Sequence, residues 1–386
     1  MKSSATNPFR FGALALDESF ADREQEIVEL ASDMRNGQDV VVFAPRRYGK
    51  SSLIWAAGQA LAGDRALIAQ VDLMTTPTKE RLASALAAAV YEQIASPLER
   101  ARERALAPFR GLRVQPTVNV NPENGSLSFS FAVARQEADI DATIERLLEL
   151  PAELGATRGR HTVLVLDEFQ EIVDIDPDLP KLLRAVFQRQ PEVSHVYLGS
   201  KRHVMERIFS DENEPFWRSA KPIELRPIEP EPFSDFLATR LRETGREPDP
   251  VAIEALLSLT GGHPYATQEL GYFLWEQTPE GEVASSARLG LALDAVLRSE
   301  NAHFTLLWES ASTVQKLVLQ ALAREPGHPY SKNYRERYEL PASTNVQKAL
   351  GALEQREVVT GERGAYRIAE PFFAEWLARQ ASSVPS

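Results

Sequence analysis

The sequence of 386 residues contains no cysteine. This absence excludes disulfide bonds, zinc sites built from thiolates and a cysteine nucleophile, and it is compatible with a reducing compartment. The six histidines show none of the spacings, such as His-Glu-x-x-His, that place two metal ligands on one face of a helix. We therefore expect no structural transition metal.

Long apolar runs are also missing, and we expect no secretory leader. No stretch of eighteen apolar residues occurs, which is about the length that a membrane-spanning helix needs. The first apolar stretch is interrupted by Asp17 and Glu18, so it is too short for the hydrophobic part of a signal peptide. We expect a cytoplasmic protein that does not contact a membrane.

A surplus of basic residues is absent as well. The chain has 43 lysines and arginines against 55 aspartates and glutamates, which gives a net charge of −12 at pH 7. This balance argues against a protein whose whole surface binds nucleic acid, although a local basic patch remains compatible with it. Hydrophobic residues make up 43% of the sequence, a value typical of a globular protein, and the length predicts two or three domains.

Strand and helix patterns alternate in the first part of the chain. Short runs of β-branched and aromatic residues predict strands that are buried on both faces of a parallel sheet, and the amphipathic segments between them predict helices. The expected strands comprise residues 39–44, 65–73, 161–172, 194–200 and 222–228, and the first expected helices comprise residues 24–35, 50–61 and 79–95. We therefore predict an α/β fold with a doubly wound, mostly parallel sheet.

Two regions depart from this alternation. Residues 114–133 alternate between apolar and polar around Asn124-Gly125, which predicts an inserted β-hairpin. After residue 228 the pattern becomes helical, and two short strands are expected near the end of the chain. The expected division is a core of residues 1–228, a helical domain of residues 229–300 and a third domain of residues 301–386.

Residues 44–52, which read Ala-Pro-Arg-Arg-Tyr-Gly-Lys-Ser-Ser, lie between a predicted strand and a predicted helix. In such a loop, backbone N–H groups and the helix N-terminus bind phosphate, Lys50 reaches the β- and γ-phosphates, and Ser51 can ligate Mg²⁺. A solvated turn followed by a serine helix cap is the alternative. The flanking strand and helix favour the phosphate-binding interpretation.

The loop has Ala44 where the usual pattern has its first glycine. We expect this change to be small, provided that the backbone does not need a positive φ there, and we expect Gly49 to matter more. Pro45 stiffens the turn, while Arg46 and Arg47 add positive charge beside the phosphates. The expected nucleotide contacts in this loop are Ala44, Pro45, Arg46, Arg47, Tyr48, Gly49, Lys50, Ser51 and Ser52.

A pair of acids follows a buried strand further along the chain. Residues 163–166 are all aliphatic, so Asp167 and Glu168 emerge at the carboxyl end of a strand, where ligands bind in such sheets. Asp167 is expected to hold Mg²⁺ through water, and Glu168 to act as the general base on the attacking water. A solvated strand end is the alternative, but a phosphate loop in the same sheet favours a catalytic role.

Ser200 and Arg218 are the remaining candidate catalytic residues. Ser200 ends the next predicted strand, where its hydroxyl could sense the γ-phosphate, orient water or simply occupy a turn. Arg218 precedes the last predicted strand and could reach a phosphate of its own chain or of a neighbour. A surface arginine is equally compatible, and Arg202 and Arg207 are rivals.

These motifs together resemble the archaeal-type ATPase family, in the STAND branch of the AAA+ P-loop ATPases, and more distantly the origin-recognition initiators. The segments "NPFRFG", "FADREQEI", "APRRYGKSSL", "VLVLDEFQEI" and "PFWRSAKPIEL" are similar to that family's opening segment, its arginine-glutamate box, its phosphate loop, its acidic motif and its arginine-bearing segment. Asp22 replaces the usual glycine of the box. The resemblance implies that Phe20 and Arg23 lie on the adenine side of a bound nucleotide.

The segment "LTGGHPYATQEL", residues 259–270, resembles the Gly-x-Pro motif of the family's helical lid, which implies that His263 and Pro264 approach the nucleotide. On physical grounds alone, Gly261-Gly262 is a helix C-cap and Pro264 begins the next helix.

The end of the chain resembles a winged-helix domain. Residues 326–380 have eight basic against seven acidic residues, which is not the clear basic footprint of a specific DNA-binding surface. We therefore favour a winged helix that contacts protein over one that contacts DNA.

The motifs and the resemblance imply an ATP-dependent molecular switch. ATP or ADP would bind with Mg²⁺, and slow hydrolysis would reset the positions of the lid and the winged helix. We expect an unidentified protein partner, and DNA binding through the winged helix and a nucleotide-dependent oligomer remain compatible with the sequence. The alternatives are an ATP-dependent DNA-binding initiator or transposition-type regulator, and a nucleotide-binding scaffold without turnover.

Overall fold

The structure is a computed structural model and describes residues 6–12, 22–61, 66–91, 114–120, 127–133, 140–362 and 364–382. These residues form two compact units. The P-loop unit comprises residues 23–46 and 50–225, and the lid unit comprises residues 1–22, 47–49 and 226–386. Each unit is described by itself below.

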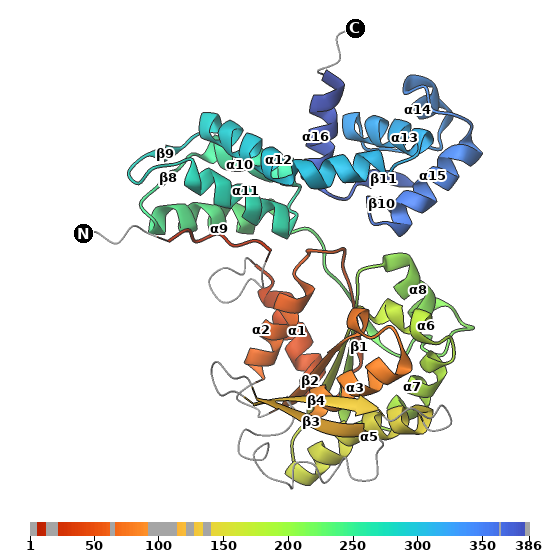
Figure 1. Ribbon diagram of the computed structural model, residues 1–386. Helices are drawn as coiled ribbons and strands as arrows, with labels where there is room; N and C mark the ends of the chain where they lie inside the picture. Colours follow the sequence, from red (N-terminus) through yellow and green to blue (C-terminus); the bar gives the residue numbers. More distant parts are fainter. Residues whose placement is uncertain are drawn as a thin grey trace. The chain divides into compact units, whose positions relative to one another are not determined.

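The P-loop unit, which includes β1 and β2 in Figure 1, is built on a five-stranded sheet in the order β2-β5-β6-β1-β7. All four pairs of neighbouring strands are parallel. The strands are β1 (Val40–Phe43), β2 (Leu67–Asp72), β5 (Thr162–Asp167), β6 (Val193–Gly199) and β7 (Lys221–Glu224). The predicted α/β class and parallel sheet are confirmed.

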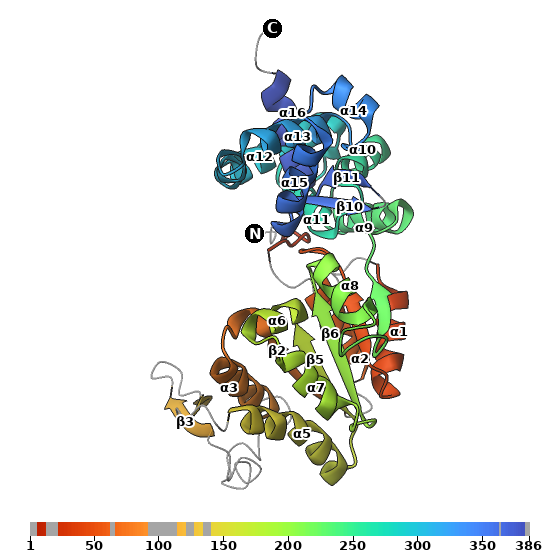
Figure 2. The same ribbon diagram turned by 90° about the vertical axis from the view of Figure 1, so that its right-hand side faces the viewer.

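Helices cover both faces of this sheet, which explains why its three central strands, β5, β6 and β1, lack polar alternation. Every residue of β6 is buried, and so are the first five residues of β5. The helices on one face are α1 (Glu24–Arg35) and α2 (Lys50–Ala60), and those on the other are α3 (Lys79–Ala89), α5 (Ile140–Arg158) and α7 (Leu179–Phe187) (Figure 2). Because neighbouring strands are parallel, the carboxyl ends of β1, β5 and β6 meet at one edge of the sheet.

Two predicted strands end earlier in the structure than the sequence suggests. Strand β5 ends at Asp167 because Glu168 has a left-handed backbone (φ 50°) and a single 3₁₀ turn, η7 (Phe169–Glu171), follows it. Strand β7 ends at Glu224, shortly before Pro227, which has no N–H to donate to a sheet. The correct strand ends matter because the candidate site is built from the residues that follow them.

The predicted hairpin is present as a separate two-stranded sheet. Strands β3 (Val114–Val120) and β4 (Leu127–Val133) pair in antiparallel fashion, while the predicted Asn124-Gly125 turn lies outside the described residues. Residues 92–95 of the predicted helix 79–95 also lie outside them.

The lid unit is mainly helical. Its helices are α9 (Pro230–Glu243), α10 (Pro250–Thr260), α11 (Pro264–Glu276), α12 (Ser286–Glu309), α13 (Thr313–Arg324), α14 (Lys332–Arg337), α15 (Ser343–Gln355) and α16 (Pro371–Ser382). Strands β10 (Val359–Glu362) and β11 (Ala365–Ile368) form an antiparallel hairpin. The boundary expected at residue 300 falls inside the continuous helix α12, so a separate lid domain and winged-helix domain stay a prediction.

The first described residues pack with the lid helices, whereas we expected them in the P-loop core. Phe9 is 1% exposed, and its ring centroid lies 6.2 Å from that of Phe236 on α9. Gly271 on α11 leaves room for this ring, because a Cβ there would lie 3.2 Å from it. The side-chain amide of Asn7 donates to the carbonyl of Tyr272 (3.1 Å) and fixes the segment at its start.

None of the helices in the described ranges is both long enough and apolar enough to cross a membrane.

Candidate active site

The phosphate loop joins β1 to α2, and Lys50 is the first residue of that helix. Its side chain is buried, and its Nζ donates to the carbonyl oxygens of Ala44 (3.1 Å) and Pro45 (3.3 Å). The first turn of α2 contains no acidic residue, so nothing in it offsets the positive end of the helix dipole. The loop therefore presents an ammonium group and a helix N-terminus to an anion.

The backbone of the loop explains why alanine is accepted at its first position. Ala44 is buried, its N–H donates to the carbonyl of Gly199 (3.3 Å), and its φ is not positive. The positive φ angles of the loop are at Arg47 (65°) and Gly49 (84°). Ala44 therefore does not need the positive φ that would require glycine, whereas Gly49 has the left-handed conformation that favours glycine.

Replacing Ala44 by glycine is expected to change the Kd for ATP by less than about threefold, which is under 1 kcal/mol, because no glycine-only conformation is needed there. The matched Gly49→Ala variant should weaken binding much more, since its φ of 84° disfavours a side chain. A calorimetric or fluorescence titration with ATP measures both values. An equal loss in the two variants would contradict this account of the loop.

The tip of the loop, residues 47–49, belongs to the lid unit by its contacts. The Arg47 guanidinium lies 4.3 Å from the ring centroid of Tyr265 on α11, and its Nη1 lies 3.7 Å from Oε2 of Glu370. The Tyr48 ring packs edge-on against the His263 ring at 4.7 Å. The loop tip therefore packs against α11 and the start of α16.

Acidic side chains surround Arg47 in this unit. Burial, together with the charges of Glu300 and Glu370, raises the pKa of Glu269 to about 8, while Arg47 opposes the shift. Burial also raises the pKa of Glu370 to about 7, with Arg47 again opposing. Arg47 thus lowers the pKa of both carboxyl groups, the buried Glu269 and the half-buried Glu370.

His263 caps α11. Burial, together with the charges of Arg367 and Arg47, lowers the pKa of His263 to about 4, so the ring is neutral at pH 7. Its Nδ1 accepts a hydrogen bond from the N–H of Ala266 (3.3 Å), which leaves the ring proton on Nε2. Gly261 is the C-cap of α10 and Pro264 the first residue of α11, as the cap pattern predicts. A contact of His263 or Pro264 with nucleotide stays a prediction.

The acidic half of the site lies at the end of β5. Asp167 Oδ1 accepts a hydrogen bond from the N–H of Glu168 (2.9 Å). Burial raises the pKa of Asp167, and the charges of Glu168 and Asp72 raise it further, while Lys50 lowers it. Asp72 is paired in register with Asp167. The sequence reasoning missed Asp72, although "LIAQVD" ends in an acid as "TVLVLD" does.

Asp167 and Glu168 are half-buried and Asp72 is exposed, and this group of carboxylate oxygens fits a divalent cation, which prefers oxygen ligands. Ser51, in the first turn of α2, offers the hydroxyl that Mg²⁺ takes in phosphate loops. Among the described residues, no three His, Asp or Glu side chains form a ready-made metal cluster. Ser51 and Asp167 stay the predicted Mg²⁺ ligands, with nucleotide phosphates and water completing the set.

Glu168 and Ser200 are brought together. The Ser200 hydroxyl, at the end of β6, donates to Oε2 of Glu168 (2.8 Å), and the serine is 5% exposed. The side-chain amide of Gln170 donates to the same carboxylate oxygen. The sequence reasoning did not single out Gln170, whose only signal is its place two residues after Glu168. The end of β6 and the turn after β5 therefore hold one carboxylate jointly.

The predicted arginines differ in their surroundings. Arg202 pairs with Glu206 (2.7 Å) and Glu224 (2.6 Å), and Arg207 lies 3.8 Å from Glu214. Arg218 is exposed, has a positive φ of 49° and lies over the ring of Trp217 at 5.2 Å. Within the described residues no carboxylate pairs with Arg218, so its charge is the least neutralised of the three.

Of the two residues expected near adenine, only one is described. Arg23 is buried, has φ 113° and pairs with Glu26 (2.7 Å), at the start of α1. Phe20 lies outside the described residues. Their adenine contacts stay predictions.

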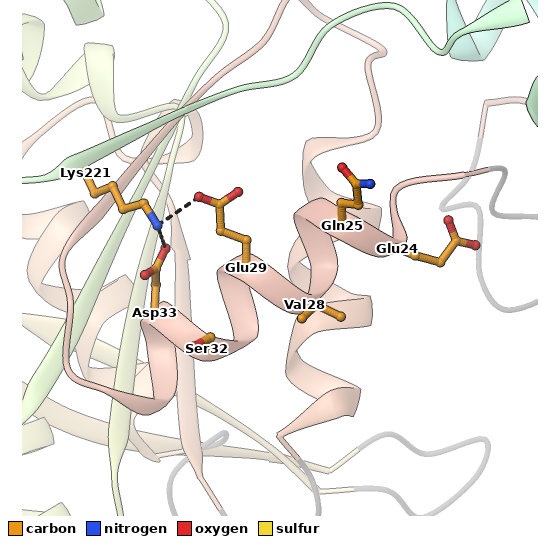
Figure 3. A pocket seen from close by; sticks show the side chains of 7 residues that line it. All are labelled: Glu24, Gln25, Val28, Glu29, Ser32, Asp33 and Lys221. Carbon is orange, nitrogen blue, oxygen red and sulfur yellow. Dashed lines mark hydrogen bonds and ion pairs between the residues drawn. The ribbon is translucent and has the colours of Figure 1, made fainter.

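A shallow pocket of the P-loop unit lies apart from these residues (Figure 3). Lys221, at the start of β7, reaches Glu29 and Asp33 of α1, both at 2.8 Å. The lining residues are Glu24, Gln25, Val28, Glu29, Ser32, Asp33 and Lys221. These ion pairs fasten α1 to the edge strand, and none of the predicted nucleotide contacts lines the pocket.

Comparison with known proteins agrees with this geometry. A family described as "ATPase domain predominantly from Archaea" matches residues 20–270, and a probable winged-helix domain matches residues 302–379. None of the curated proteins compared with the chain is significantly similar to it.

Solved structures share the fold along nearly the whole chain. A Walker-type ATPase of Pyrococcus abyssi is 16% identical with a TM-score of 0.65, covering 94% of this chain and 97% of its own. The ORC2 protein of Aeropyrum pernix, solved as ADPNP and ADP complexes, is 16% identical with a TM-score of 0.56, covering 97% of this chain and 99% of its own.

Proposed function

Because the chain belongs to the family of ATPase domains found predominantly in Archaea, we propose that it is an ATP-binding molecular switch that hydrolyses ATP slowly. Nucleotide would bind at the phosphate loop, and its γ-phosphate would set the conformation of the lid helices and the winged helix. Hydrolysis would return the protein to its starting state.

One observation carries the proposal. The Glu168 carboxylate is fixed at the carboxyl edge of the sheet by Ser200 on the neighbouring strand, next to an Asp167 carboxyl whose pKa responds to Lys50. A base, a cation-binding acid and a phosphate-binding ammonium therefore share one edge. This is the set of groups that phosphoryl transfer to water requires.

Each residue has a defined task in the proposed reaction. Lys50 and the N–H groups at the start of α2 bind the phosphates, and Asp167 and Ser51 hold Mg²⁺. Bound Mg²⁺ supplies neutralisation of the phosphate charge. Glu168 accepts a proton from the attacking water, and Arg218 is the candidate that stabilises charge on the γ-phosphate, from the same chain or from a neighbouring copy.

The contacts of the loop tip support the switch. Arg47 lies beside Glu370 and over Tyr265 in the lid unit, although it is part of the phosphate-binding sequence. Nucleotide phosphates would compete with Glu370 for the Arg47 guanidinium. Binding would thereby change an ion pair at the start of α16, the last helix of the winged-helix segment.

The test is a measurement of ATP binding and of phosphate release by the purified chain with Mg²⁺. We expect binding together with slow release. Binding without any release would favour the alternative of a scaffold that does not turn over ATP. A chain that does not bind ATP would contradict both.

DNA binding through the winged helix is the second candidate function. Helix α15, in the position of a recognition helix, exposes Asn345, Gln347 and Lys348, but Glu354 lies near its end. The balanced charge of this segment favours a protein partner over DNA. In gel-shift titrations with duplex DNA, we expect no ATP-dependent shift at physiological salt. A shift with a steep salt dependence would instead support an ATP-dependent initiator or transposition-type regulator.

A further inference from the structure

The Glu168 carboxylate is held by one of its two oxygens. Oε2 accepts from the Ser200 hydroxyl and from Nε2 of Gln170. Within the ranges that the structure describes, Oε1 accepts from no donor. The two oxygens of the candidate base are therefore in different surroundings.

Gln170 is itself fixed in one orientation. It is 1% exposed, and its Nε2 also approaches Oε1 of Glu171 (3.4 Å), which pairs with Nζ of Lys201 (2.7 Å). Ionised carboxylates only accept hydrogen bonds, so the NH₂ group of Gln170 has to face both glutamates. Lys201 follows Ser200 directly, and the end of β6 thus holds the turn after β5 at two points.

The place of Gln170 is not explained by packing. Its Oε1 is buried and has no partner among the described residues. A buried amide with one unpaired atom is unfavourable for folding, and an apolar side chain of similar size would avoid it. Gly199 leaves room for Met205 and for this amide, because a Cβ there would lie 2.4 Å from Cγ of Met205 and 2.8 Å from Oε1 of Gln170. The hydrogen bond that the NH₂ group of Gln170 donates to Glu168 therefore accounts for an amide at this position.

Glu168 needs this support because of its backbone. Its φ of 50° is in the left-handed region, which side chains other than that of glycine rarely adopt. The conformation turns the residue out of β5, and nothing in a regular strand then fixes its side chain. The hydrogen bonds that Ser200 and Gln170 donate to Oε2 fix the side chain of Glu168 instead.

We propose that Gln170 is a positioning residue: together with Ser200 it anchors Oε2 of Glu168 and leaves Oε1 as the atom that takes the proton of the attacking water. The inference rests on the proposed ATP hydrolysis and goes beyond it by assigning the amide and the reacting oxygen. In the step, the water oxygen bonds to the γ-phosphorus, the bond from phosphorus to the bridging oxygen breaks with its electrons on ADP, and one water proton moves to Oε1.

The test compares steady-state ATP hydrolysis by the full-length wild type, Gln170→Met, Gln170→Glu and Glu168→Gln. Methionine keeps the length of the side chain without a donor, and glutamate keeps its shape with acceptors only. We expect both Gln170 variants to lower kcat about tenfold or more, with KM and ATP affinity changed less than about twofold, since no phosphate contact is removed. Should the methionine variant fail to fold, the glutamate variant decides the question alone.

A double mutant separates positioning from general loss of structure. In the Glu168→Gln background, Gln170→Met is expected to cause no further decrease in the residual rate, because it acts through Glu168. The matched control is Gln190→Met, which removes another buried glutamine of the same unit, one that donates to the carbonyl of Leu148 (3.0 Å), and which should leave kcat unchanged.

Three outcomes overturn the inference. A kcat within twofold of wild type in both Gln170 variants, while Glu168→Gln is inactive, contradicts the positioning role and leaves the ATPase proposal standing. An equal decrease in the wild-type and Glu168→Gln backgrounds shows a merely structural effect. Absence of phosphate release from the wild type overturns the ATPase proposal and this inference together.

Discussion

Replacing Glu168 by glutamine is expected to lower kcat for ATP hydrolysis by a factor of about 100 or more, because the amide cannot accept the proton of the attacking water. Glutamine keeps the length of the side chain and its carbonyl oxygen, which can still accept from Ser200. Affinity for ATP should therefore stay close to that of the wild type. Phosphate release under saturating ATP, together with an ATP titration, measures both quantities.

Lys50→Ala is the contrasting variant. Its ammonium group donates to two carbonyl oxygens of the loop, where we expect it to meet the phosphates, so its loss should weaken ATP binding at least about tenfold as well as abolish turnover. A pattern in which both variants retain wild-type hydrolysis would show that the reaction occurs elsewhere. A pattern in which Glu168→Gln loses binding would show that Glu168 contacts nucleotide directly.

The second large effect is expected at Gly262. A Cβ at this position would lie 2.3 Å from the carbonyl oxygen of Ile228, whose N–H in turn donates to the carbonyl of Gly262 (2.9 Å). Its φ is 69°, so Gly262→Ala adds both left-handed strain and a backbone clash. We expect a loss of about 3 kcal/mol in the free energy of unfolding, which corresponds to roughly 6–12 °C in Tm for a unit of this size.

Gly261 provides the matched control for this substitution. Its φ is 57°, but a Cβ there would meet nothing within 4 Å, so Gly261→Ala adds strain alone. A loss of about 1 kcal/mol, or roughly 2–4 °C, is expected. Thermal unfolding followed by circular dichroism compares the two variants. Equal shifts would mean that the close approach to Ile228 does not restrict position 262.

Much of the P-loop unit could be predicted from its sequence because its signals are local. A strand buried on both faces needs an unbroken apolar run, as in "TVLVLD" and "VVVF", and the cap residues of the helices reveal where these begin. Ser200 could be placed near Glu168 because both follow strands of one parallel sheet. Their hydrogen bond follows from that topology.

What the sequence concealed depends on conformation and on distant contacts. The early end of β5 results from the left-handed backbone of Glu168, and the residue types in "LDEFQE" do not predict this conformation. Gln170 looks like one more polar residue after an acidic pair, and only the packing beside Gly199 shows that its amide is aimed at Glu168. Likewise, no local pattern connects Asn7 or Phe9 with helices more than two hundred residues later.

That last connection has a consequence for the synthesis of the chain. Phe9 precedes the P-loop unit in the sequence, yet the helices that bury it, α9 and α11, begin only at Pro230 and Pro264. During translation the Phe9 ring therefore stays unburied until α9 and α11 have been synthesised. The P-loop unit, which is synthesised before them, can fold in that interval. The packing of Phe9 in the lid unit can therefore be completed only after the P-loop unit has been synthesised.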